Sequence, residues 1–540
     1  MMPPPYIISD EDPCPENRTM FEAFEWYCPA DHKHWRRLRD VAPSLAAIGI
    51  DNMWIPPGCK AGWHGSNGYD IYDLYDLGEF DQKGSRYTKW GTKEELVDMV
   101  KTANAHGIGI YWDTVLNHKA AADYSEPAIA VKVDPKDRRK DIGKPEKIEA
   151  WTGFDFKGRN GVYSPMRWNK SHFTGTDYDH NTKTNGVWRF VEKRGWAQDV
   201  DEELGNYDYL MFADIDHNHP EVRQDIFYWG QWLASQVNLS GLRLDAIKHF
   251  SGNFVRDFIM HLDRTVGRNW FIVGEYWRED TPVLARYIEY MHNRISLFDV
   301  KLVSNFSRLS MTKKADLRTI FQGSLALAKP ANAVTFVQNH DTQDRQSLET
   351  PVLPYFMPMA YAIILLTAYS TYPCVFYGDL YGTPGPSPTQ DFSNFVPPAC
   401  GGHLPKMVLA RKLYAYGTQI DYFDQPHCIG FTRAGHRAHS NGAGLAVLMT
   451  NKNKYAYKRM KVGQQHAGER WTDILKWAWG EVVIDQFGWG SFPVGPKSVG
   501  VWVNAAADGR EFLDDFVFDD DIYGFTKKRT PPTKDDLPIV

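Results

Sequence analysis

The chain has 540 residues, which is too long for a single hydrophobic core and predicts more than one domain. Hydrophobic residues make up 43% and charged residues 24% of the sequence, as is ordinary for a soluble globular protein. The net charge of −6 comes without a cluster of basic residues, so we expect neither nucleic acid nor an anionic membrane surface as a partner.

The N-terminal residues and the cysteines bear on the cellular compartment. Residues 1–6 contain neither a basic region nor an apolar run, and no apolar stretch reaches the ~18 residues that span a membrane. We therefore expect a cytoplasmic protein. The cysteines lie far apart without C-x-x-C spacing, so we expect reduced thiols and neither disulfides nor a zinc site. They are Cys14, Cys28, Cys59, Cys374, Cys400 and Cys428.

Alternating strand and helix patterns begin near residue 20. Residues 20–26 and 52–55 have the character of strands and enclose a stretch in which apolar residues recur at helical spacing. Residues 94–105 predict a helix closed by Gly107, and a strand follows over 109–113. Repeated βα units of this kind predict a parallel sheet.

The alternation stops between about residues 119 and 217. This segment is rich in Gly, Asn and Asp and is too long for an ordinary loop, so we expect a small inserted domain. The alternation then resumes with a helix over 222–236. Further apolar strands, each ending in a charged or Gly-rich corner, follow at 242–244, 270–273, 333–337 and 374–377. The whole pattern predicts a (β/α)8 TIM barrel, whose corners lie on the C-terminal face where barrel enzymes have their active sites.

Short strands with turn signals after residue 416 predict a C-terminal antiparallel β-sandwich. Residues 505–540 contain Asp-rich runs and then two prolines, so we expect an acidic, loosely ordered tail. The predicted α/β architecture therefore has four parts. They are the barrel in residues 1–118 and 218–415, the inserted domain in 119–217, the β domain in 416–504 and the tail in 505–540.

The run 241–249, GLRLDAIKH, concentrates reactive side chains at one predicted strand end. Leu242 and Leu244 share one face of the strand, whereas Arg243 and Asp245 share the other. We expect the guanidinium to lower the pKa of the Asp245 carboxyl and keep it ionised, as a nucleophile requires. In isolation, an Arg-x-Asp pair is more often a structural ion pair.

Other predicted strand ends carry further carboxylates. Asp113, Glu275 and Asp341 each follow a different strand. Because the carboxyl ends of barrel strands share one rim, we expect these side chains to lie near Asp245. An ionised Asp, a protonatable Glu and a further Asp around one centre are what glycoside cleavage through a covalent intermediate requires, with two carboxyl groups ~5 to 5.5 Å apart.

At these corners the sequence resembles the α-amylase family, glycoside hydrolase family 13. The resemblance is carried by four motifs in the family's order, DTVLNH at 113–118, GLRLDAIKH at 241–249, GEYW at 274–277 and FVQNHD at 336–341. Residues 68–80, 205–216 and 376–382 are further similar to the bacterial liquefying amylases and their intracellular fungal relatives. The resemblance covers roughly residues 18 to 503.

The resemblance implies a retaining, endo-acting hydrolase of α-1,4-glucosidic bonds in starch, glycogen or maltooligosaccharides. It implies that Asp245 is the nucleophile, that Glu275 is the general acid and then base, and that Asp341 holds the sugar hydroxyl groups in the transition state. The residues implied to bind substrate are Tyr69, His118, Arg243, Lys248, His249 and His340.

The resemblance also implies a calcium ion (Ca2+). Its implied ligands are hard oxygen atoms, namely the side chains of Asn117, Asp208 and Asp214 and the backbone carbonyl of His249. Asp179, Asp216 and Asn218 resemble part of a second metal cluster. However, the sequence has Ala197 where close relatives have the Asp of a Trp-Asp-Trp motif, and the loss of that carboxylate weakens the second site.

Two other functions stay open. A 4-α-glucanotransferase that remodels intracellular α-glucan would use the same residues, because a sugar hydroxyl can replace water in the attack on the covalent intermediate. The other is a non-catalytic carbohydrate-binding protein, although the intact Asp245, Glu275 and Asp341 argue against it. In each case we expect a monomer whose partner is an α-glucan.

Overall fold

The computed structural model describes residues 6–192, 195–385, 392, 394–514 and 517–524. Its centre is a closed barrel of parallel strands in the order β1-β16-β15-β14-β13-β12-β5-β2. The strands are β1 (Met20–Glu22), β2 (Asn52–Ile55), β5 (Gly109–Thr114), β12 (Gly241–Leu244), β13 (Phe271–Gly274), β14 (Ser296–Phe298), β15 (Ala333–Phe336) and β16 (Tyr372–Phe376). The predicted (β/α)8 barrel is confirmed.

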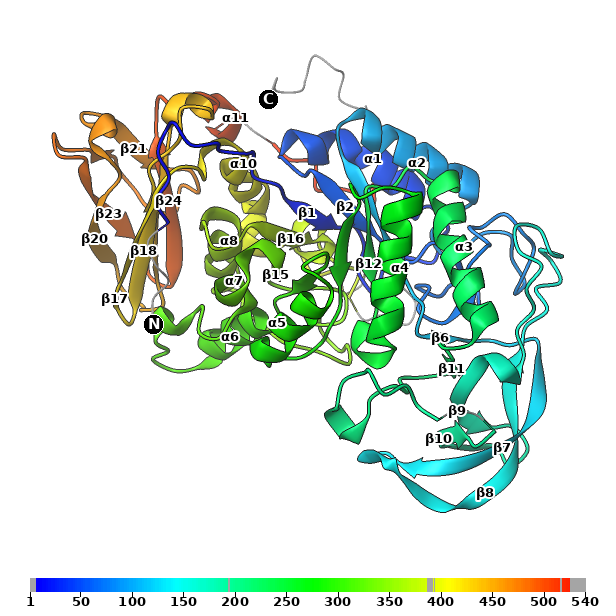
Figure 1. Cartoon of the computed structure of the whole chain (residues 1–540). Coiled ribbons are helices and arrows are strands. Elements are labelled where there is room, and N and C mark those ends of the chain that lie inside the picture. Colours follow the sequence, from blue (N-terminus) through cyan, green and yellow to red (C-terminus); the bar gives the residue numbers. More distant parts are fainter. Residues whose placement is uncertain (1–5, 193–194, 386–391, 393, 515–516, 525–540) are drawn as a thin grey trace.

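Helices follow the strands and cover the outside of the barrel (Figure 1). They are α1 (His34–Ala47), α2 (Lys93–Ala105), α3 (Pro220–Gln236), α4 (Gly252–Thr265), α5 (Thr281–Tyr290), α6 (Val300–Met311), α7 (Leu325–Ala328), α8 (Met357–Leu366), α9 (Tyr377–Tyr381) and α10 (Leu404–Tyr414). Helix α2 begins with a capping box between Thr92 and Glu95, which satisfies two backbone N–H groups of the first turn. Every residue of α8 is buried, and this helix contacts both the barrel and the C-terminal region.

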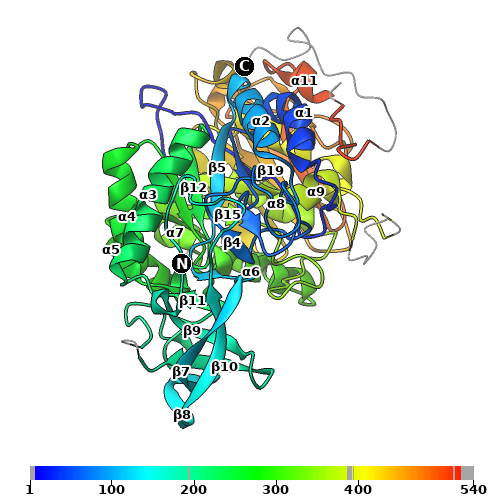
Figure 2. The same ribbon diagram turned by 90° about the vertical axis from the view of Figure 1, so that its right-hand side faces the viewer.

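A six-stranded sheet lies between β5 and α3 in the sequence and projects from the barrel (Figure 2). Its strands pair antiparallel in the order β6-β11-β9-β10-β7-β8. They are β6 (His118–Lys119), β7 (Tyr124–Asp134), β8 (Asp137–Gly153), β9 (Phe173–Asp179), β10 (Thr184–Phe190) and β11 (Ala213–Ile215). Strand β11 returns the chain to the barrel rim, where Asp214 pairs with His118. The insert predicted after the third barrel strand is therefore present.

The C-terminal region is a sandwich of two antiparallel sheets, β17-β18-β19-β24-β21-β22 and β20-β23. Their strands are β17 (Gln419–Gln425), β18 (Cys428–Arg433), β19 (Leu445–Thr450), β20 (Ala456–Lys461), β21 (Arg470–Asp473), β22 (Val482–Val483), β23 (Trp489–Val494) and β24 (Ser498–Asn504). Leu448 and Trp502 from the larger sheet share a hydrophobic core with Met460 and Phe492 from the smaller one. This arrangement confirms the predicted β-sandwich.

The segment after β24 differs from the prediction. Its described residues form α11 (Arg510–Asp514), in which Leu513 is fully buried, and continue to Ile522, which is 2% exposed. Part of the predicted acidic tail therefore packs against the fold, because Leu513, before the first acidic run, and Ile522, after the second, are buried. The other residues of the predicted tail lie outside the described residues.

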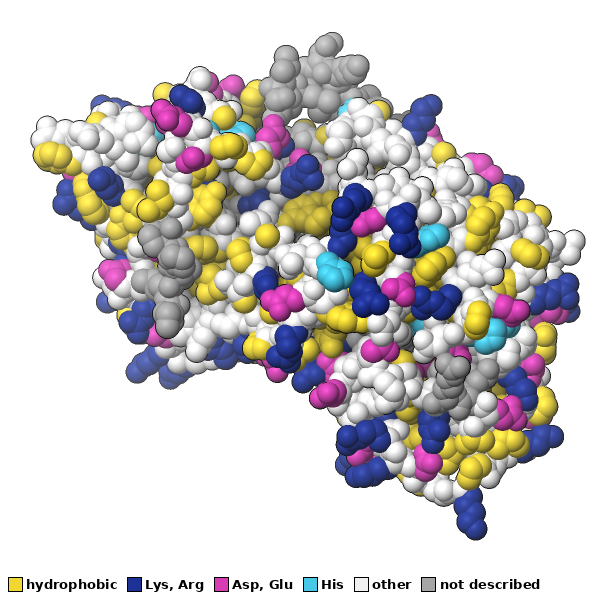
Figure 3. Space-filling model, viewed as in Figure 1, with side chains coloured by type: hydrophobic (Ala, Val, Ile, Leu, Met, Phe, Trp, Pro, Cys, Tyr) yellow, Lys and Arg dark blue, Asp and Glu magenta, His cyan; other side chains and the backbone are white. Residues whose placement is uncertain are grey.

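Further features bear on partners and redox state. Among the described helices, none combines the length and the apolar character needed to cross a membrane. All six cysteines are free thiols. On the face shown in Figure 3, Lys and Arg side chains are interspersed with Asp and Glu side chains.

Gly241, the first residue of β12, tests how tightly the barrel strands pack. A Cβ atom there would lie 2.1 Å from the Phe271 carbonyl oxygen and 2.8 Å from Cδ1 of Tyr111. Because backbone cannot move aside cheaply, Gly241→Ala should lower the free energy of unfolding by ~1–3 kcal/mol in denaturant titrations. Gly495→Ala is the control, since its nearest heavy atom is 3.8 Å away and a change within ~0.5 kcal/mol is expected. Equal stability of the two variants would contradict this packing.

Candidate active site

Arg243 joins three carboxylates at the carboxyl end of the barrel. Its side chain extends from β12 and is 1% exposed. Nη1 donates to Asp113 Oδ1 at 2.8 Å and to Asp245 Oδ1 at 2.5 Å, and Nη2 donates to Glu275 Oε2 at 2.8 Å. Since β5, β12 and β13 are neighbours in the barrel, three of the predicted strand-end carboxylates do meet.

The register between β12 and β13 places Asp245 next to Glu275. Leu244 lies beside Gly274 on β13, so the next residues, Asp245 and Glu275, leave adjacent strands together. The Ala246 N–H donates to Glu275 Oε2 at 3.0 Å. Ala246 has a left-handed backbone with φ of 52°, a conformation that is rare for a residue other than glycine and that aims this N–H at the carboxylate.

The pKa of Asp245 differs from the expectation. Burial raises it to about 8, and the charge of Arg243 opposes this increase only in part. The carboxylates of Glu275, Asp113 and Asp341 add to the increase. The prediction of a lowered pKa was wrong because burial outweighs the charge of Arg243, which neighbouring carboxylates also share.

Asp341 lies beside His340 in the loop after β15. His340 Nε2 is 3.3 Å from Asp341 Oδ2, and His340 Nδ1 is 2.6 Å from Oε1 of Glu22. Burial lowers the pKa of His340, but the two carboxylates outweigh burial and raise it to about 10. Burial alone would raise the pKa of Asp341, but the charge of His340 outweighs burial, and the net shift of the Asp341 pKa is downward. These directions favour an ionised Asp341 beside a protonated His340.

Stacked rings form one wall of the site. Tyr69 precedes β4 (Ile71–Asp73), and its ring lies parallel to that of His340 at a centroid distance of 5.1 Å. Trp26 stacks on Tyr69 at 6.0 Å. The Tyr69 hydroxyl donates to Asp113 Oδ2 at 2.8 Å, and the Tyr69 carbonyl oxygen lies 2.7 Å from His118 Nε2. Aromatic faces beside a few fixed polar groups are typical of small-molecule sites.

A cavity of about 410 Å³ contains this site. The predicted residues that line it are Tyr69, His118, Asp245, Lys248, His249, Glu275, His340 and Asp341. Arg243 lies beneath them, in contact with the carboxylates. The lining residues that the sequence did not suggest are Trp26, Tyr207, Leu210, Met211, Trp277, Ser347 and Leu348. Trp277 could have been found, because it stands two residues after Glu275 at the end of β13.

Cavity size alone does not locate the site. A cavity of about 750 Å³ lies between the barrel and the C-terminal sandwich, with a lining that includes Met357, Phe376 and Trp477 and the charged residues Asp379 and Lys497. The smaller cavity is the better candidate because its carboxylates converge on shared cations.

Lys248 and His249 belong to a 3-10 turn (Ile247–His249) that follows Asp245. Lys248 Nζ donates to Glu203 Oε2 at 2.9 Å and to the Trp277 carbonyl at 3.0 Å. Burial lowers the pKa of His249 to about 3, so its ring is neutral, and Nδ1 donates to the Tyr207 carbonyl at 2.9 Å. The bonds to Glu203 and Tyr207 hold the turn against the segment that precedes β11.

The residues implied to bind calcium lie where the insert meets the barrel. Asp214 on β11 pairs with His118, the neighbour of Asn117. Asp208 and Asp214 are 3% and 1% exposed, and burial raises the pKa of both carboxyls well above the usual range, with the charge of Asp208 adding to the increase at Asp214. Asn117 Oδ1 is buried without a hydrogen-bond partner among the described residues. Buried carboxylates beside an unpaired amide oxygen fit a hard divalent cation.

The residues of the suggested second cluster have local partners. Asp179 Oδ1 accepts from the N–H of Asn181 in the turn after β9 at 3.0 Å, and Asp216 Oδ1 accepts from the N–H of Asn218 at 3.0 Å. Ala197 donates its N–H to Asp208 Oδ2 at 2.9 Å, so this position supplies a backbone donor where a second ion would need a carboxylate. These bonds account for both aspartates without a second ion.

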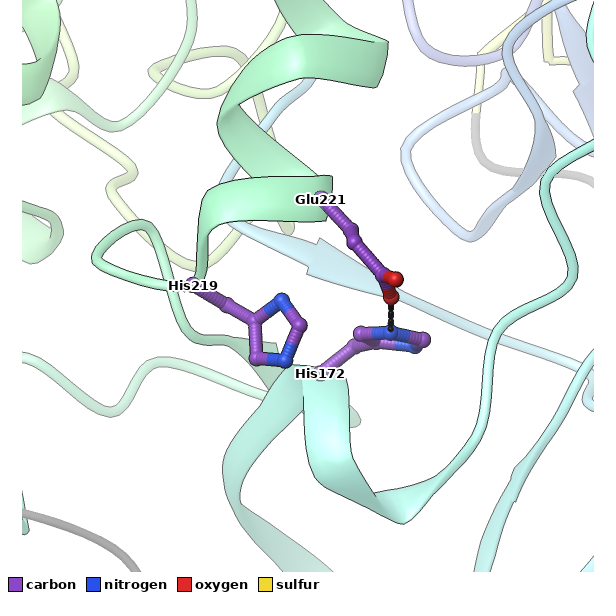
Figure 4. A group of neighbouring side chains, drawn as sticks. All are labelled: His172, His219 and Glu221. Atoms are coloured by element: carbon purple, nitrogen blue, oxygen red, sulfur yellow. Dashed lines mark hydrogen bonds and ion pairs between the residues drawn. The ribbon is translucent and has the colours of Figure 1, made fainter.

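A group that the sequence did not suggest lies at the start of α3. His172, His219 and Glu221 each place one nitrogen or oxygen atom within 4.8 Å of the others (Figure 4). His172 Nδ1 accepts the Asn169 N–H at 3.1 Å, so the ring proton is on Nε2, which donates to Glu221 Oε2 at 3.1 Å. A metal at Nε2 would need the lone pair that this proton occupies. The group is therefore a hydrogen-bonded contact between insert and barrel.

The shared guanidinium should matter for both stability and activity. In Arg243→Met the carboxylates lose their common cation, so the free energy of unfolding should fall by ~3–5 kcal/mol in denaturant titrations, and activity should be lost. Arg470→Met is the control, because its ion pair with Glu481 is largely exposed (side chains 66% and 48%) and should contribute at most ~1 kcal/mol. Similar losses for the two variants would show that Arg243 is an ordinary ion pair.

The sequence and the fold of this chain are similar to those of known proteins. The chain matches the family described as the α-amylase catalytic domain over residues 40–397 and the α-amylase C-terminal family over residues 445–503. It is 45% identical to an α-amylase of Bacillus licheniformis, across 90% of this chain and 93% of that protein. It is 38% identical to a cytoplasmic α-amylase of Escherichia coli (strain K12), across 90% of this chain and 99% of that protein. The fold is similar to the crystal structure of an Anoxybacillus α-amylase, with a TM-score of 0.61 and 16% identity over 91% of this chain and 97% of that one. The chain therefore belongs to the α-amylase family.

Proposed function

We propose that this protein hydrolyses internal α-1,4-glucosidic bonds in starch, glycogen or maltooligosaccharides and retains the anomeric configuration. The observation that carries the proposal is the pair of Asp245 and Glu275 on one guanidinium. Bonds to two nitrogens of Arg243 keep the carboxyl groups close together, as a covalent mechanism with a separation of ~5 to 5.5 Å requires. Membership of the α-amylase family and relatives of that name support the same activity.

In the proposed reaction, the Asp245 carboxylate attacks the anomeric carbon while Glu275 gives its proton to the leaving oxygen. The glycosidic bond breaks, and the sugar becomes an ester of Asp245. Glu275 then takes a proton from water, whose oxygen attacks the anomeric carbon and releases Asp245. In this scheme Glu275 carries the proton when the reaction begins, and two displacements restore the original configuration.

The other side chains of the cavity would bind the sugar. Asp341, ionised beside His340, would accept hydrogen bonds from sugar hydroxyl groups in the oxocarbenium-like transition state. The stacked Tyr69 would face the same sugar. We assign His118 and Arg243 to the side of this sugar, and Lys248 and His249 to the side of the leaving group.

We further propose that Asn117, Asp208, Asp214 and the backbone carbonyl of His249 hold Ca2+. The support comes from the buried carboxylates with raised pKa values and the unpaired Asn117 oxygen. An ion bound there would supply the positive charge that these groups lack and would join the insert to the rim of the barrel.

We also propose that the protein acts in the cytoplasm, as a monomer, on an α-glucan partner. The Escherichia coli relative is named a cytoplasmic α-amylase, which supports the location. The monomeric state is a prediction from the sequence that size-exclusion chromatography can test.

Retention can be tested on the first product formed. The new reducing ends released from starch should appear first as the α-anomer in proton NMR spectra, because the second displacement reverses the inversion of the first. A β-anomer would refute the covalent mechanism. Short maltooligosaccharides should give shorter chains, whereas a major product longer than the substrate would favour the glucanotransferase.

Matched variants complete this test. Asp245→Asn, Glu275→Gln and Asp341→Asn remove a charge or a proton but little volume, so each should lower starch hydrolysis by more than about a thousandfold with little change in far-UV circular dichroism. Substantial hydrolysis by Asp245→Asn would contradict its role as nucleophile.

The calcium proposal predicts a coupling of ion binding to stability. An ion that binds only the folded chain stabilises it by mass action, by ~2.7 kcal/mol at a hundred times its Kd, so a chelator should lower the melting temperature and the activity together. Asp208→Ala should make the melting temperature insensitive to added calcium. Asp216→Ala is the control and should keep the response, because Asp216 has a backbone partner in its own turn. A wild-type melting curve indifferent to chelator would contradict the calcium site.

A further inference from the structure

Glu22 is a buried carboxylate that the proposed reaction does not use. It is the last residue of β1, on the same rim as the catalytic cavity, and it is fully buried. Its Oε2 atom has no hydrogen-bond partner among the described residues. A buried carboxylate is costly unless a specific partner compensates for the lost hydration, so its contacts indicate its purpose.

The partner of Glu22 is His340. Glu22 Oε1 lies 2.6 Å from His340 Nδ1 and accepts the His340 backbone N–H at 3.3 Å. One carboxylate oxygen therefore fixes both the ring and the backbone of a residue that lines the cavity. The two residues are 318 positions apart in the sequence, so only the closed barrel brings them together.

Both ring nitrogens of His340 face carboxylates. Nδ1 faces Glu22, and Nε2 lies 3.3 Å from Asp341 Oδ2. A neutral imidazole has one N–H and would turn a lone pair toward one of these anions, whereas the imidazolium donates to both. Tyr69 and Trp26 lie parallel to the ring, which leaves it little freedom to rotate.

From this geometry we propose that Glu22 is a positioning residue that keeps His340 as an imidazolium, so that His340 presents a fixed positive charge and an N–H donor to Asp341 and to the sugar. This inference rests on the proposed function, because it assigns His340 to the substrate. Glu22 acts through His340 and does not itself reach the cavity.

The two carboxylates that face His340 act on its pKa in the same direction. Burial lowers the pKa of His340, but Asp341 in the loop after β15 and Glu22 on β1 outweigh burial and raise it to about 10. The charge of Arg243 on β12 lowers the pKa of both carboxyls. Burial raises the pKa of Glu22 to about 7. A raised histidine pKa means that the positive charge is complete well below that value and is lost as the pH rises through about 10. The ion pair therefore exists between about pH 7 and about pH 10.

Glu22→Gln tests the proposal, because an amide can still accept the Nδ1–H but carries no charge. The alkaline limb of kcat/KM for a chromogenic maltooligosaccharide should move to lower pH by about one unit or more. Glu25→Gln is the matched control. Glu25 is equally buried, but its Oε2 accepts from Gln343 and from the Tyr27 N–H, so this variant should leave the limb in place. An unshifted limb in Glu22→Gln, or equal shifts in both variants, would overturn the proposal.

A titration of His340 in the wild-type protein does not depend on whether the variant folds. It needs no turnover, so it is also independent of the proposed function. In wild-type protein labelled with 13C at histidine Cε1, with His340→Gln used for assignment, the His340 signal should stay at its protonated position between about pH 6 and about pH 8.5. A wild-type His340 that titrates near its ordinary value of about 6.5 would refute the inference, whatever the enzyme hydrolyses. Failure of the proposed function would appear instead as the absence of starch hydrolysis in wild-type protein with His340 charged.

Discussion

The active site depends on one interaction, the sharing of the Arg243 guanidinium among Asp113, Asp245 and Glu275. With a single partner, a buried arginine would be a local ion pair. Partners on three adjacent strands make it a constraint on the barrel, because a shift of β5, β12 or β13 by one residue would leave a charge buried and unpaired. The guanidinium also lies over the Trp54 ring at 4.9 Å, which holds its plane. The register of the barrel and the aim of the carboxylates are therefore set by the same contacts.

Negative charge collects at two neighbouring places on this rim, and each needs a cation of its own. Around the cavity, Arg243 and His340 supply the positive charge from the chain itself. At Asp208 and Asp214 the proposed calcium ion would supply it. The turn that ends at His249 connects the cavity with the proposed calcium site. It follows Asp245 directly, and the His249 ring bonds to the segment that leads into β11. Calcium bound at this site would therefore order the cavity through the backbone of the turn, and not through electrostatic interactions over a long distance.

Much of the fold could be predicted from the sequence because the signals are local. Seven of the barrel strands have recognisable apolar runs, whereas β14 (Ser296–Phe298) was missed because its two apolar residues, Leu297 and Phe298, are adjacent and show no alternation. The positions of the reactive carboxylates followed from the same logic, since each lies near or just beyond the carboxyl end of a strand. What could not be predicted depends on tertiary contacts. The sequence pairs Arg243 with Asp245 alone. Only the fold shows that Asp245 is buried, which raises its pKa, and that Glu275 and Asp113 share its cation. The packing of Leu513 was hidden for a similar reason, because the acidic composition of the tail outweighs its few apolar side chains.

The charges along the rim alternate in sign, and this has a consequence for how the site titrates. Glu22, His340 and Asp341 form one run of anion, cation and anion, and Arg243 with its carboxylates forms another. Asp341 affects the pKa of Asp245, and Arg243 affects the pKa of both Glu22 and Asp341, so the two runs are coupled. In a coupled set, the gain or loss of a proton at one member changes the affinity of every other member for protons. A pH profile of this enzyme therefore reports the rim as a whole, and its two limbs are better assigned by removing single charges at buried positions than by matching them to the ordinary pKa of any one residue.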